Sequence, residues 1–396
     1  MRVIATRTVL VPKERGSETR VALVPPAVST LVDAGWRILV QPGAGVAAGY
    51  PDEVFVAHGA EMDTAGIRRP DVVVGVRLGG ASEDPLALER RFGPGTVFVG
   101  VADPLGEPAA IQPIADAGLT LYSLDLLPRI SRAQSMDVLS SQSTVTGYKA
   151  AILAAAALPK MFPMLTTAAG TMPPAEVLVI GAGVSGLTAI ATARRLGAVV
   201  QAYDIRPAAQ EDIESVGARA VMLPLDPGDA EDVTGYAKDI GEALERRQQE
   251  LLAQVLAGVD VAITTAAIPG RRAPTLITAD AVERMPPGSV VVDCAAPRGG
   301  NCVLTRPDEE VVTERGVRIL GPTNLPATVP HDASRMFAKN IVAFLTTMLI
   351  DPTAPNLNDE IVRGTLVTRD GEVVHEEVRQ MVGALPSPEA TRVARA

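Results

Sequence analysis

The chain has 396 residues, with 36 Lys and Arg against 46 Asp and Glu, so its formal net charge is −10. That length exceeds what one core usually organises and predicts two domains, while a hydrophobic content of 47% excludes a disordered chain. An acidic chain with 3% aromatic residues lacks the clustered cations and stacking rings of nucleic-acid binders. We therefore expect no nucleic acid among its partners.

The supply of cysteine and histidine limits the possible chemistry. Two cysteines, Cys294 and Cys302, and three histidines do not make a disulfide framework or a cluster with metal-ligand spacing. We therefore predict no metal site and a reducing compartment. No apolar run of signal-peptide length follows the N-terminus, and none reaches the roughly 20 residues that span a bilayer. We expect a cytoplasmic chain without a membrane span of its own.

The first 124 residues alternate between short β-branched runs and amphipathic stretches. The runs that begin at Thr8, Ile38, Asp71, Thr96 and Leu119 are predicted strands. Residues 25–35 and 108–118 are predicted helices, because each stretch has Pro near its start and Gly at its end, although Pro113 weakens the second prediction. This alternation predicts a parallel sheet with helices on its faces.

The rest of the chain predicts a second layer of the same kind. A long helix over 141–161 precedes a turn-rich stretch at 166–176, and a second α/β run ends near Ile319. The apolar periodicity of 336–349 predicts a helix that returns to the first domain. We predict an α/β fold of two Rossmann-like domains, each a mostly parallel sheet flanked by helices: a discontinuous first domain of residues 1–140 and 325–396, and a second domain of residues 141–324.

The most informative motif follows the apolar run 176–180. Gly181-Ala-Gly-Val-Ser-Gly186 comes directly after that run and precedes a helical pattern that ends at Gly197. In a dinucleotide fingerprint the first glycine permits a tight turn, the second lets the backbone approach a pyrophosphate, and the third allows close helix–strand packing. The order of strand, turn and helix predicts a nucleotide site. A glycine-rich turn in an unrelated α/β layer is the alternative.

A second strand pattern, 199–204, ends in Asp204 about 20 residues beyond the glycines, where a carboxylate can accept hydrogen bonds from the adenosine ribose. Asp204 would repel a 2′-phosphate, which favours NAD(H) over NADP(H), and the nearby Arg206 weakens that preference. The candidate cofactor-binding residues of these two motifs are Gly181, Ala182, Gly183, Val184, Ser185, Gly186, Asp204, Ile205 and Arg206.

Two later apolar runs, 259–270 and 288–295, are predicted strands of the same sheet. Each ends in a loop at the carboxyl end of its strand, where ligands bind in open α/β sheets. Ala266, Ala267 and Ile268 are further candidate cofactor-binding residues, because they would let a cofactor lie across the sheet edge. Plain packing at the strand end explains these residues equally well.

The segment Pro128–Gln142 resembles the nicotinamide-holding loop of the NAD(H)-binding component of proton-translocating NAD(P) transhydrogenases. The similarity extends through residues 235–238, 263–270 and 299–302, and residues 18–23 resemble a segment of the related alanine dehydrogenases. It covers nearly the whole chain. Pro297 and Arg298 depart from the family pattern, so the conformation of their loop is not predicted.

The resemblance implies roles for particular residues. It places the nicotinamide among Arg129, Gln134, Asp137 and Ser140, and it places Gly235 and Tyr236 on a mobile loop that closes over bound nucleotide. The Gln134 amide can both donate and accept hydrogen bonds, and Arg129 can pair with Asp137 to fix the loop. Without the resemblance, that pair would be interpreted as solvated charges at a helix start.

Histidine positions help to separate two reaction classes. Oxidation of an amino or hydroxy acid needs a general base, most often histidine. Alanine dehydrogenases carry a histidine at the end of the strand that corresponds to 96–101, where this chain reads Gly100–Asp103, and the histidines at 58, 331 and 375 do not match that position. Transfer between two nicotinamide rings moves no solvent proton and suits a site without that base. Arg20 and Arg77 could bind a carboxylate or act as structural cations.

The resemblance implies a transhydrogenase component, the soluble portion of an alpha subunit, that binds NAD(H). It would transfer hydride from NADH to NADP⁺ on a partner subunit and be catalytic only with NADP(H)-binding and membrane-spanning subunits, which couple transfer to proton translocation. A homodimer peripheral to the inner membrane is also implied. The alternatives are an alanine dehydrogenase-like NAD-dependent amino-acid dehydrogenase and a non-catalytic nucleotide-sensing module.

Overall fold

The computed structural model describes residues 7–64, 66, 70–79, 91–225, 241–268, 270–352 and 354–385. The chain divides into two compact units, which are described separately. Unit 1 comprises Met1–Gln142 and Val329–Ala396, and unit 2 comprises Ser143–Thr328. The boundaries expected from the sequence were 140/141 and 324/325. No helix in the described residues is long and apolar enough to cross a membrane.

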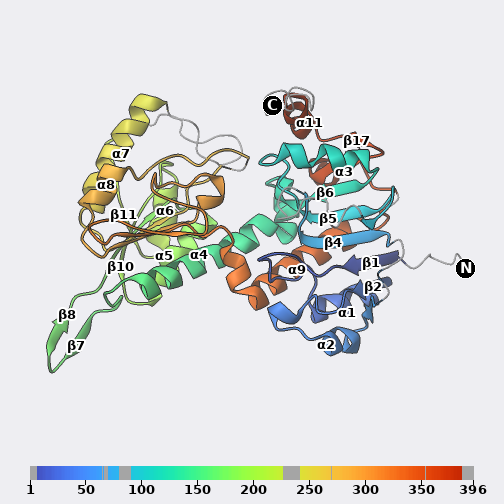
Figure 1. Cartoon of the computed structure of the whole chain (residues 1–396), viewed down its shortest axis with the longest axis horizontal. Coiled ribbons are helices and arrows are strands. Elements are labelled where there is room, and N and C mark those ends of the chain that lie inside the picture. Colours follow the sequence, from blue (N-terminus) through green and yellow to red (C-terminus); the bar gives the residue numbers. More distant parts are fainter. Residues whose placement is uncertain are drawn as a thin grey trace, which may run out of the picture. The chain divides into compact units, whose positions relative to one another are not determined.

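Unit 1 contains a mostly parallel sheet of eight strands in the order β17-β16-β6-β5-β4-β1-β2-β3. Six strands run parallel, and β16 and β17 add an antiparallel edge (Figure 1). The strands are β1 (Arg7–Val11), β2 (Trp36–Val40), β3 (Glu61–Met62), β4 (Val72–Arg77), β5 (Val97–Val101), β6 (Thr120–Ser123), β16 (Leu366–Arg369) and β17 (Glu372–Val373).

Helices cover both faces of this sheet. Apolar side chains of α1 and α9, such as Leu31 and Phe344, join one buried cluster, and those of α3 and α11, such as Ile114 and Val378, join the other. The helices of unit 1 are α1 (Pro25–Asp33), α2 (Asp52–Ala57), α3 (Gln112–Asp116), α9 (Pro330–Thr347), α10 (Glu360–Thr365) and α11 (Glu376–Gly383). Because α9 belongs to this unit, the C-terminal segment of the chain completes the N-terminal core.

Unit 2 contains a seven-stranded sheet in the order β11-β10-β9-β12-β13-β15-β14, parallel except for β14. The strands are β9 (Glu176–Ile180), β10 (Val199–Tyr203), β11 (Arg219–Ala220), β12 (Val261–Thr264), β13 (Val290–Asp293), β14 (Glu310–Val312) and β15 (Arg318–Leu320). Residues 177–180 and all of β12 are buried, as expected for parallel strands covered on both faces.

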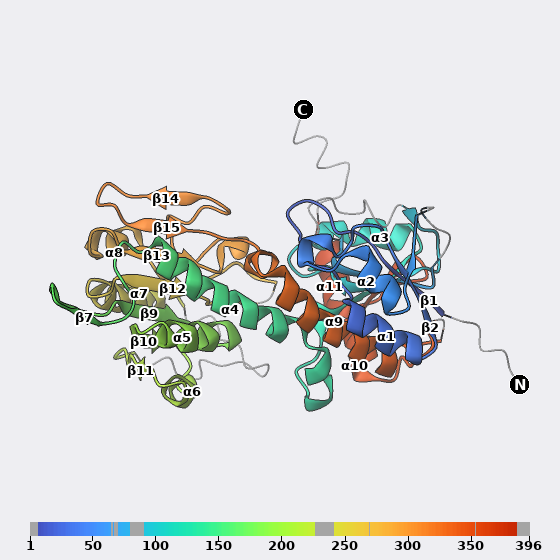
Figure 2. The ribbon, with the colours of Figure 1, turned by 90° about the horizontal axis from the view of Figure 1, so that it is seen from below.

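The helices of unit 2 form two layers, visible from below in Figure 2. One layer holds α4 (Val138–Ala157), which starts in unit 1 and continues in unit 2, with α5 (Val184–Arg195) and α6 (Ala209–Ser215). The opposite layer holds α7 (Glu242–Leu256) and α8 (Ala279–Arg284). A hairpin of β7 (Leu165–Thr167) and β8 (Gly170–Met172) projects from this unit (Figure 1).

The structure confirms the predicted fold class of two mostly parallel sheets flanked by helices, and it changes two local predictions. The helix expected over 108–118 divides into a 3₁₀ turn (Pro108–Ala110) and the short α3, whose first turn contains Pro113. Proline has no N–H to donate to the preceding turn, so the helix restarts there. The turn-rich stretch 166–176 contains most of the β7–β8 hairpin, two short strands that the sequence pattern did not predict.

Candidate dinucleotide-binding site

The glycine turn of unit 2 follows β9, the strand at which the order of the sheet reverses. Strands β10 and β11 extend the sheet on one side of β9, and β12 and β13 extend it on the other. Ligands of open α/β sheets bind at this topological switch point, beyond the carboxyl ends of the strands. The turn therefore stands where a doubly wound sheet binds a nucleotide.

Two of the three glycines are required by the protein's own packing. Gly181 has a φ of +97°, and a Cβ there would lie 2.7 Å from Thr265 Oγ1. A Cβ on Gly186 would lie 1.8 Å from the Gly181 carbonyl oxygen, so only glycine allows α5 to approach the turn this closely. These contacts match the roles expected for the first and third glycines of the fingerprint.

Gly183 differs from the other two glycines because no atom lies within 4 Å of the position that a Cβ would take. It is also the N-cap residue of α5, and no side chain caps that helix. The exposed N-terminus of a helix attracts phosphate through its free N–H groups and its dipole. Open space beside an uncapped helix end fits a pyrophosphate.

The neighbouring fingerprint residues differ in exposure. Ala182 is buried and Val184 is exposed. The hydroxyl oxygen of Ser185 is buried and has no hydrogen-bond partner among the described residues. Ile205, after β10, is partly buried against the apolar cluster on the α7 side of the sheet.

Asp204 follows β10 and joins two loops of the site. Its Oδ2 accepts a hydrogen bond from the Ala182 N–H at 2.7 Å, across the turn after β9. The same carboxylate accepts from Arg206 Nε at 2.9 Å and from Arg206 Nη2 at 2.9 Å, so the guanidinium binds it with two donors. An acidic residue therefore stands at the end of β10, as the sequence pattern predicted. Arg206, which was expected to weaken the preference for NAD(H), forms a two-point ion pair with it.

The loop after β12 is held against the glycine turn. The Thr265 N–H donates to the Ile180 carbonyl at 2.8 Å, and its hydroxyl donates to the Gly181 carbonyl at 3.1 Å. Beyond it, Ala266 and Ile268 are partly buried and Ala267 is exposed. The structure thus brings the loop containing these three candidates next to the fingerprint within unit 2.

A buried asparagine that the sequence-based candidates did not include fixes this loop. Asn301 Oδ1 accepts from the Ala266 N–H at 3.1 Å, and its Nδ2 donates to the carbonyls of Ala266 and Pro274, both at 2.8 Å. Asn301 has no exposed surface. Its position in the 299–302 segment was the only sequence signal, because its partners are 27 and 35 residues away.

Asp293, at the end of β13, is a second residue that sequence reasoning missed. This fully buried carboxylate accepts four hydrogen bonds, from Thr264 Oγ1, the Ala295 and Cys302 N–H groups and Thr305 Oγ1, at 2.6–3.0 Å. Four donors offset much of the cost of burying its charge. Asp293 therefore links the end of β12 to the loop that carries Asn301.

The loop with Pro297 and Arg298 has a defined conformation. Ala296–Arg298 form a 3₁₀ turn that ends at Gly299, in the left-handed region at φ +92°. The Arg298 carbonyl accepts from the Ala273 N–H at 2.8 Å. The residues that depart from the family pattern thus belong to an ordered turn.

The residues assigned to the nicotinamide by resemblance lie in unit 1. Gln134 belongs to a 3₁₀ segment, η6 (Ser131–Met136), and both Arg129 and Gln134 are exposed. The carboxylate of Asp137 accepts from the Ser140 N–H at 2.9 Å and from Ser140 Oγ at 2.5 Å. Asp137 therefore caps the first turn of α4, which is a structural role that the sequence reasoning did not assign to it.

Arg20 has the environment of a structural cation. It is 7% exposed and donates three hydrogen bonds to the Glu18 carboxylate and one to Gln142 Oε1. Arg77 ends β4 and is partly buried. Gly235 and Tyr236 lie outside the described residues.

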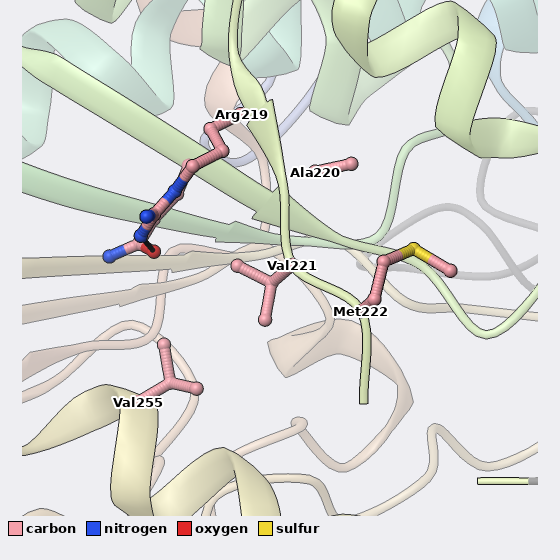
Figure 3. Close-up of a pocket in the computed structure, with 6 residues that line it drawn as sticks. Arg219, Ala220, Val221, Met222 and Val255 are labelled. Carbon is pink, nitrogen blue, oxygen red and sulfur yellow. Dashed lines mark hydrogen bonds between the residues drawn. The ribbon is translucent and has the colours of Figure 1, made fainter. Parts of the chain in front are cut away.

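A cavity of about 410 Å³ lies at the outer edge of the unit 2 sheet (Figure 3). It is lined by Gln201, Arg219, Ala220, Val221, Met222 and Val255. The guanidinium of Arg219 already donates to Gln201 Oε1 at 2.8 Å, as the dashed line shows. The cavity adjoins β11, which is one of the two edge strands of this sheet. It shares no lining residue with the glycine turn.

The strand orders and the glycine turn define a two-unit protein of the Rossmann type. Comparison with known families is consistent with this architecture: residues 10–146 match the alanine dehydrogenase/PNT N-terminal domain, and residues 150–376 match the C-terminal domain. The chain belongs to the alanine dehydrogenase/PNT family.

Individual relatives fall into two groups. The chain is 44% identical over 378 residues to a protein of Rhodospirillum rubrum named as the first portion of NAD(P) transhydrogenase subunit alpha, covering 93% of this chain and 97% of that protein. A crystal structure of transhydrogenase from Sinorhizobium meliloti superposes with a TM-score of 0.83 at 41% identity, over 93% of this chain and 100% of that one. Alanine dehydrogenase of Bacillus subtilis is 28% identical over 384 residues, 94% of each chain.

Proposed function

We propose that this chain is the NAD(H)-binding component of a transhydrogenase and that it presents NADH for hydride transfer to NADP⁺ on a partner subunit. The observation that carries the proposal is the glycine turn at the switch point, with open space at Gly183 and the carboxylate of Asp204 beside it. The 44% identity to a transhydrogenase alpha subunit supports this reaction over other uses of the fold.

The residues of unit 2 fit a dinucleotide. The N-terminus of α5 and the open position at Gly183 would hold the pyrophosphate, and Asp204 would accept hydrogen bonds from the adenosine ribose. Asp204 also disfavours a 2′-phosphate, which supports NAD(H). Bound NADH supplies the hydride and leaves as NAD⁺. The chain's task is then to hold the nicotinamide in a fixed orientation, which is the role proposed for Arg129 and Gln134.

The surroundings of β5 support transfer between two nicotinamide rings over amino-acid oxidation. The strand is followed by Ala102, which is fully buried, and not by a histidine. The three histidines of the chain, His58, His331 and His375, each lie at an end of a helix. An amino-acid dehydrogenase needs a base at the substrate carbon, whereas direct transfer of hydride releases no proton at the ring.

The proposal includes partners and a location. NADP(H)-binding and membrane-spanning subunits would provide the acceptor and the coupling to proton translocation, and this chain would be catalytic only with them. It would act as a homodimer, cytoplasmic and peripheral to the inner membrane through those subunits. The R. rubrum relative is named as one portion of an alpha subunit, which supports an assembly of several chains.

Steady-state transfer tests the proposal. NADH oxidation by an NADP⁺ analogue is measured with this chain alone and with an added NADP(H)-binding transhydrogenase component, and pyruvate plus ammonia serves as a parallel acceptor. We expect transfer only when the component is present. Oxidation of NADH by pyruvate and ammonia with this chain alone would instead identify a self-contained amino-acid dehydrogenase, and binding of NADH without either reaction would favour a nucleotide sensor.

A further inference from the structure

The 3₁₀ segment η6 has a buried side chain at every third position and exposed side chains between them. Ala133 and Met136 are each 2% exposed and pack in the core of unit 1, whereas Gln134 projects outward. Gln134 therefore lies on the outer face of a six-residue 3₁₀ helix. The hydrogen bonds of a 3₁₀ helix have poorer geometry than those of an α-helix, so contacts with the surrounding elements help to fix its position.

The first of these contacts comes from the start of α10. Arg132 donates to the two carboxylate oxygens of Asp359 at 2.5 and 2.9 Å, in a two-point ion pair. The Asp359 side chain is 16% exposed and also accepts from the Ile361 N–H at 2.9 Å, so α10 fixes its orientation. Two-point pairs of this kind define direction as well as distance. The pair ties the residue two before Gln134 to a segment 227 residues later in the chain.

The second contact comes from α9. Asn340 is 7% exposed on this helix, and its Nδ2 donates to the Ser135 carbonyl at 2.8 Å. Its Oδ1 is buried and has no hydrogen-bond partner among the described residues. A buried amide with an unpartnered oxygen is costly for stability alone. The hydrogen bond that Asn340 does make is to the backbone next to Gln134.

We propose that Arg132, Asn340 and Asp359 are positioning residues that hold the Gln134 side chain for contact with the nicotinamide. The proposal rests on the proposed function, because it assumes that Gln134 contacts that ring. The three residues act through the backbone of 132–135, which they anchor on both sides of Gln134. Their loss should weaken recognition of the nicotinamide and leave recognition of the remainder of the nucleotide intact.

Equilibrium binding of two probes to the full chain tests this. NADH carries the nicotinamide, and ADP-ribose lacks it, so the ratio of their dissociation constants measures what the ring contributes. The variants are Arg132→Gln, Asp359→Asn and Asn340→Leu. Each variant removes either the Arg132–Asp359 ion pair or the hydrogen bond from Asn340 to the Ser135 carbonyl. We therefore expect NADH to bind about fivefold more weakly, and ADP-ribose to bind within about twofold of the original chain. Arg132→Lys, which keeps the charge without the two-point geometry, should be intermediate.

The controls separate positioning from general damage. Arg37→Gln removes another two-point pair of unit 1, with Glu61 at 2.5 and 2.8 Å, and should change neither constant. Asn340→Leu should fold, because it replaces a buried amide whose oxygen has no partner among the described residues by an apolar side chain of similar size. Unchanged NADH binding in Arg132→Gln and Asn340→Leu, or equal weakening of both probes, would overturn the proposal.

The original chain distinguishes this proposal from the proposed function. If it binds NADH and ADP-ribose equally, Gln134 has no nicotinamide contact to position and the proposal fails, while nucleotide binding stands. If it binds neither probe, the proposed function fails and this proposal fails with it.

Discussion

Gly183 and Gly186 lie three residues apart in one turn, but they require glycine for different reasons. A Cβ at Gly183 meets nothing within 4 Å, whereas one at Gly186 lies 1.8 Å from a backbone oxygen. We expect Gly183→Ala to change the free energy of unfolding by less than about 0.5 kcal/mol and to weaken NADH binding by about tenfold or more. Thermal unfolding and NADH titration of the variant measure the two effects.

Gly186→Ala is the matched comparison. Its Cβ overlaps the Gly181 carbonyl, so we expect a loss of about 1–3 kcal/mol in unfolding free energy from overpacking alone. The two alanine variants should therefore separate binding from stability within one turn. A Gly183→Ala variant that binds NADH as tightly as the original chain would show that the pyrophosphate does not approach this residue.

Asp204 and Arg206 together should determine whether the site prefers NADH or NADPH, because they form one ion pair. Asp204→Ala removes the ribose acceptor and releases the Arg206 guanidinium, which can then approach a 2′-phosphate. We expect the ratio of NADH to NADPH affinity to shift towards NADPH by about tenfold, since hydrogen bonds to charged groups contribute about 1.5–3 kcal/mol. Competition titration with both nucleotides measures the shift.

The double variant Asp204→Ala, Arg206→Gln is the control for that experiment. It should lose NADH affinity without gaining NADPH affinity, because the released cation is absent. An unchanged affinity ratio in Asp204→Ala alone would contradict the role assigned to this carboxylate.

At the scale of elements, a partly buried carboxylate connects two strand ends of unit 1. Glu14 follows β1, and its Oε1 accepts from the Val76 N–H of β4 at 2.6 Å. Burial raises the pKa of Glu14 from 4.5 to about 8, and the Glu18 charge adds to that increase, while the hydrogen bond from Val76 and the charge of Arg20 lower it. The folded unit therefore favours the protonated form of Glu14.

This pKa shift makes stability depend on pH in a defined direction. Because the folded pKa exceeds the unfolded one, the contribution of Glu14 is complete below pH 4.5 and is lost as the pH rises towards 8. Glu14→Gln should match the original chain at pH 5 and be more stable at pH 8, by roughly 1–3 kcal/mol. Denaturant unfolding at the two pH values measures the difference. Glu61→Gln, at an exposed strand, should give no such gain, and a pH-independent effect of Glu14→Gln would contradict this account.

Elements determined by residues that are close in the sequence were predicted better than contacts between residues far apart in it. The β9 strand, the glycine turn and β10 follow from residues adjacent in the chain, and they form where the pattern predicted. The helix predicted over 108–118 was less certain, because local propensity does not say whether a helix bends or restarts at Pro113. Elements whose signal is local were therefore predictable to within a few residues.

Residues that fix the candidate site were less predictable. Asn301, Asn340 and Asp359 are single polar residues in ordinary contexts, and their roles come from partners 35, 205 and 227 residues away. No spacing rule connects such positions in one sequence. The glycine motif supplied the residues proposed to bind the pyrophosphate and ribose, the resemblance supplied those proposed for the nicotinamide, and the structure supplied the residues that hold them.

At the scale of the whole molecule, the two units contain different portions of the proposed nucleotide contacts. The glycine turn, Asp204 and Asn301 belong to unit 2, whereas Gln134 and its anchors belong to unit 1. Each unit has its own sheet and buried clusters. Recognition of the adenosine and pyrophosphate should therefore be separable from recognition of the nicotinamide.

A fragment of residues 138–328 tests this separation, since it keeps α4 whole and contains all of the unit 2 sheet. We expect it to bind ADP-ribose within about threefold of the full chain and to bind NADH no more tightly than ADP-ribose, because Arg129, Gln134 and Asp137, three of the four residues proposed to surround the ring, are absent. Calorimetric titration of both ligands measures this, and a Gly183→Ala fragment should bind both about tenfold or more weakly. If the fragment does not fold, Gln134→Ala in the full chain replaces it and should lower NADH affinity alone. A fragment that prefers NADH as strongly as the full chain would show that unit 2 recognises the nicotinamide without the loop of unit 1.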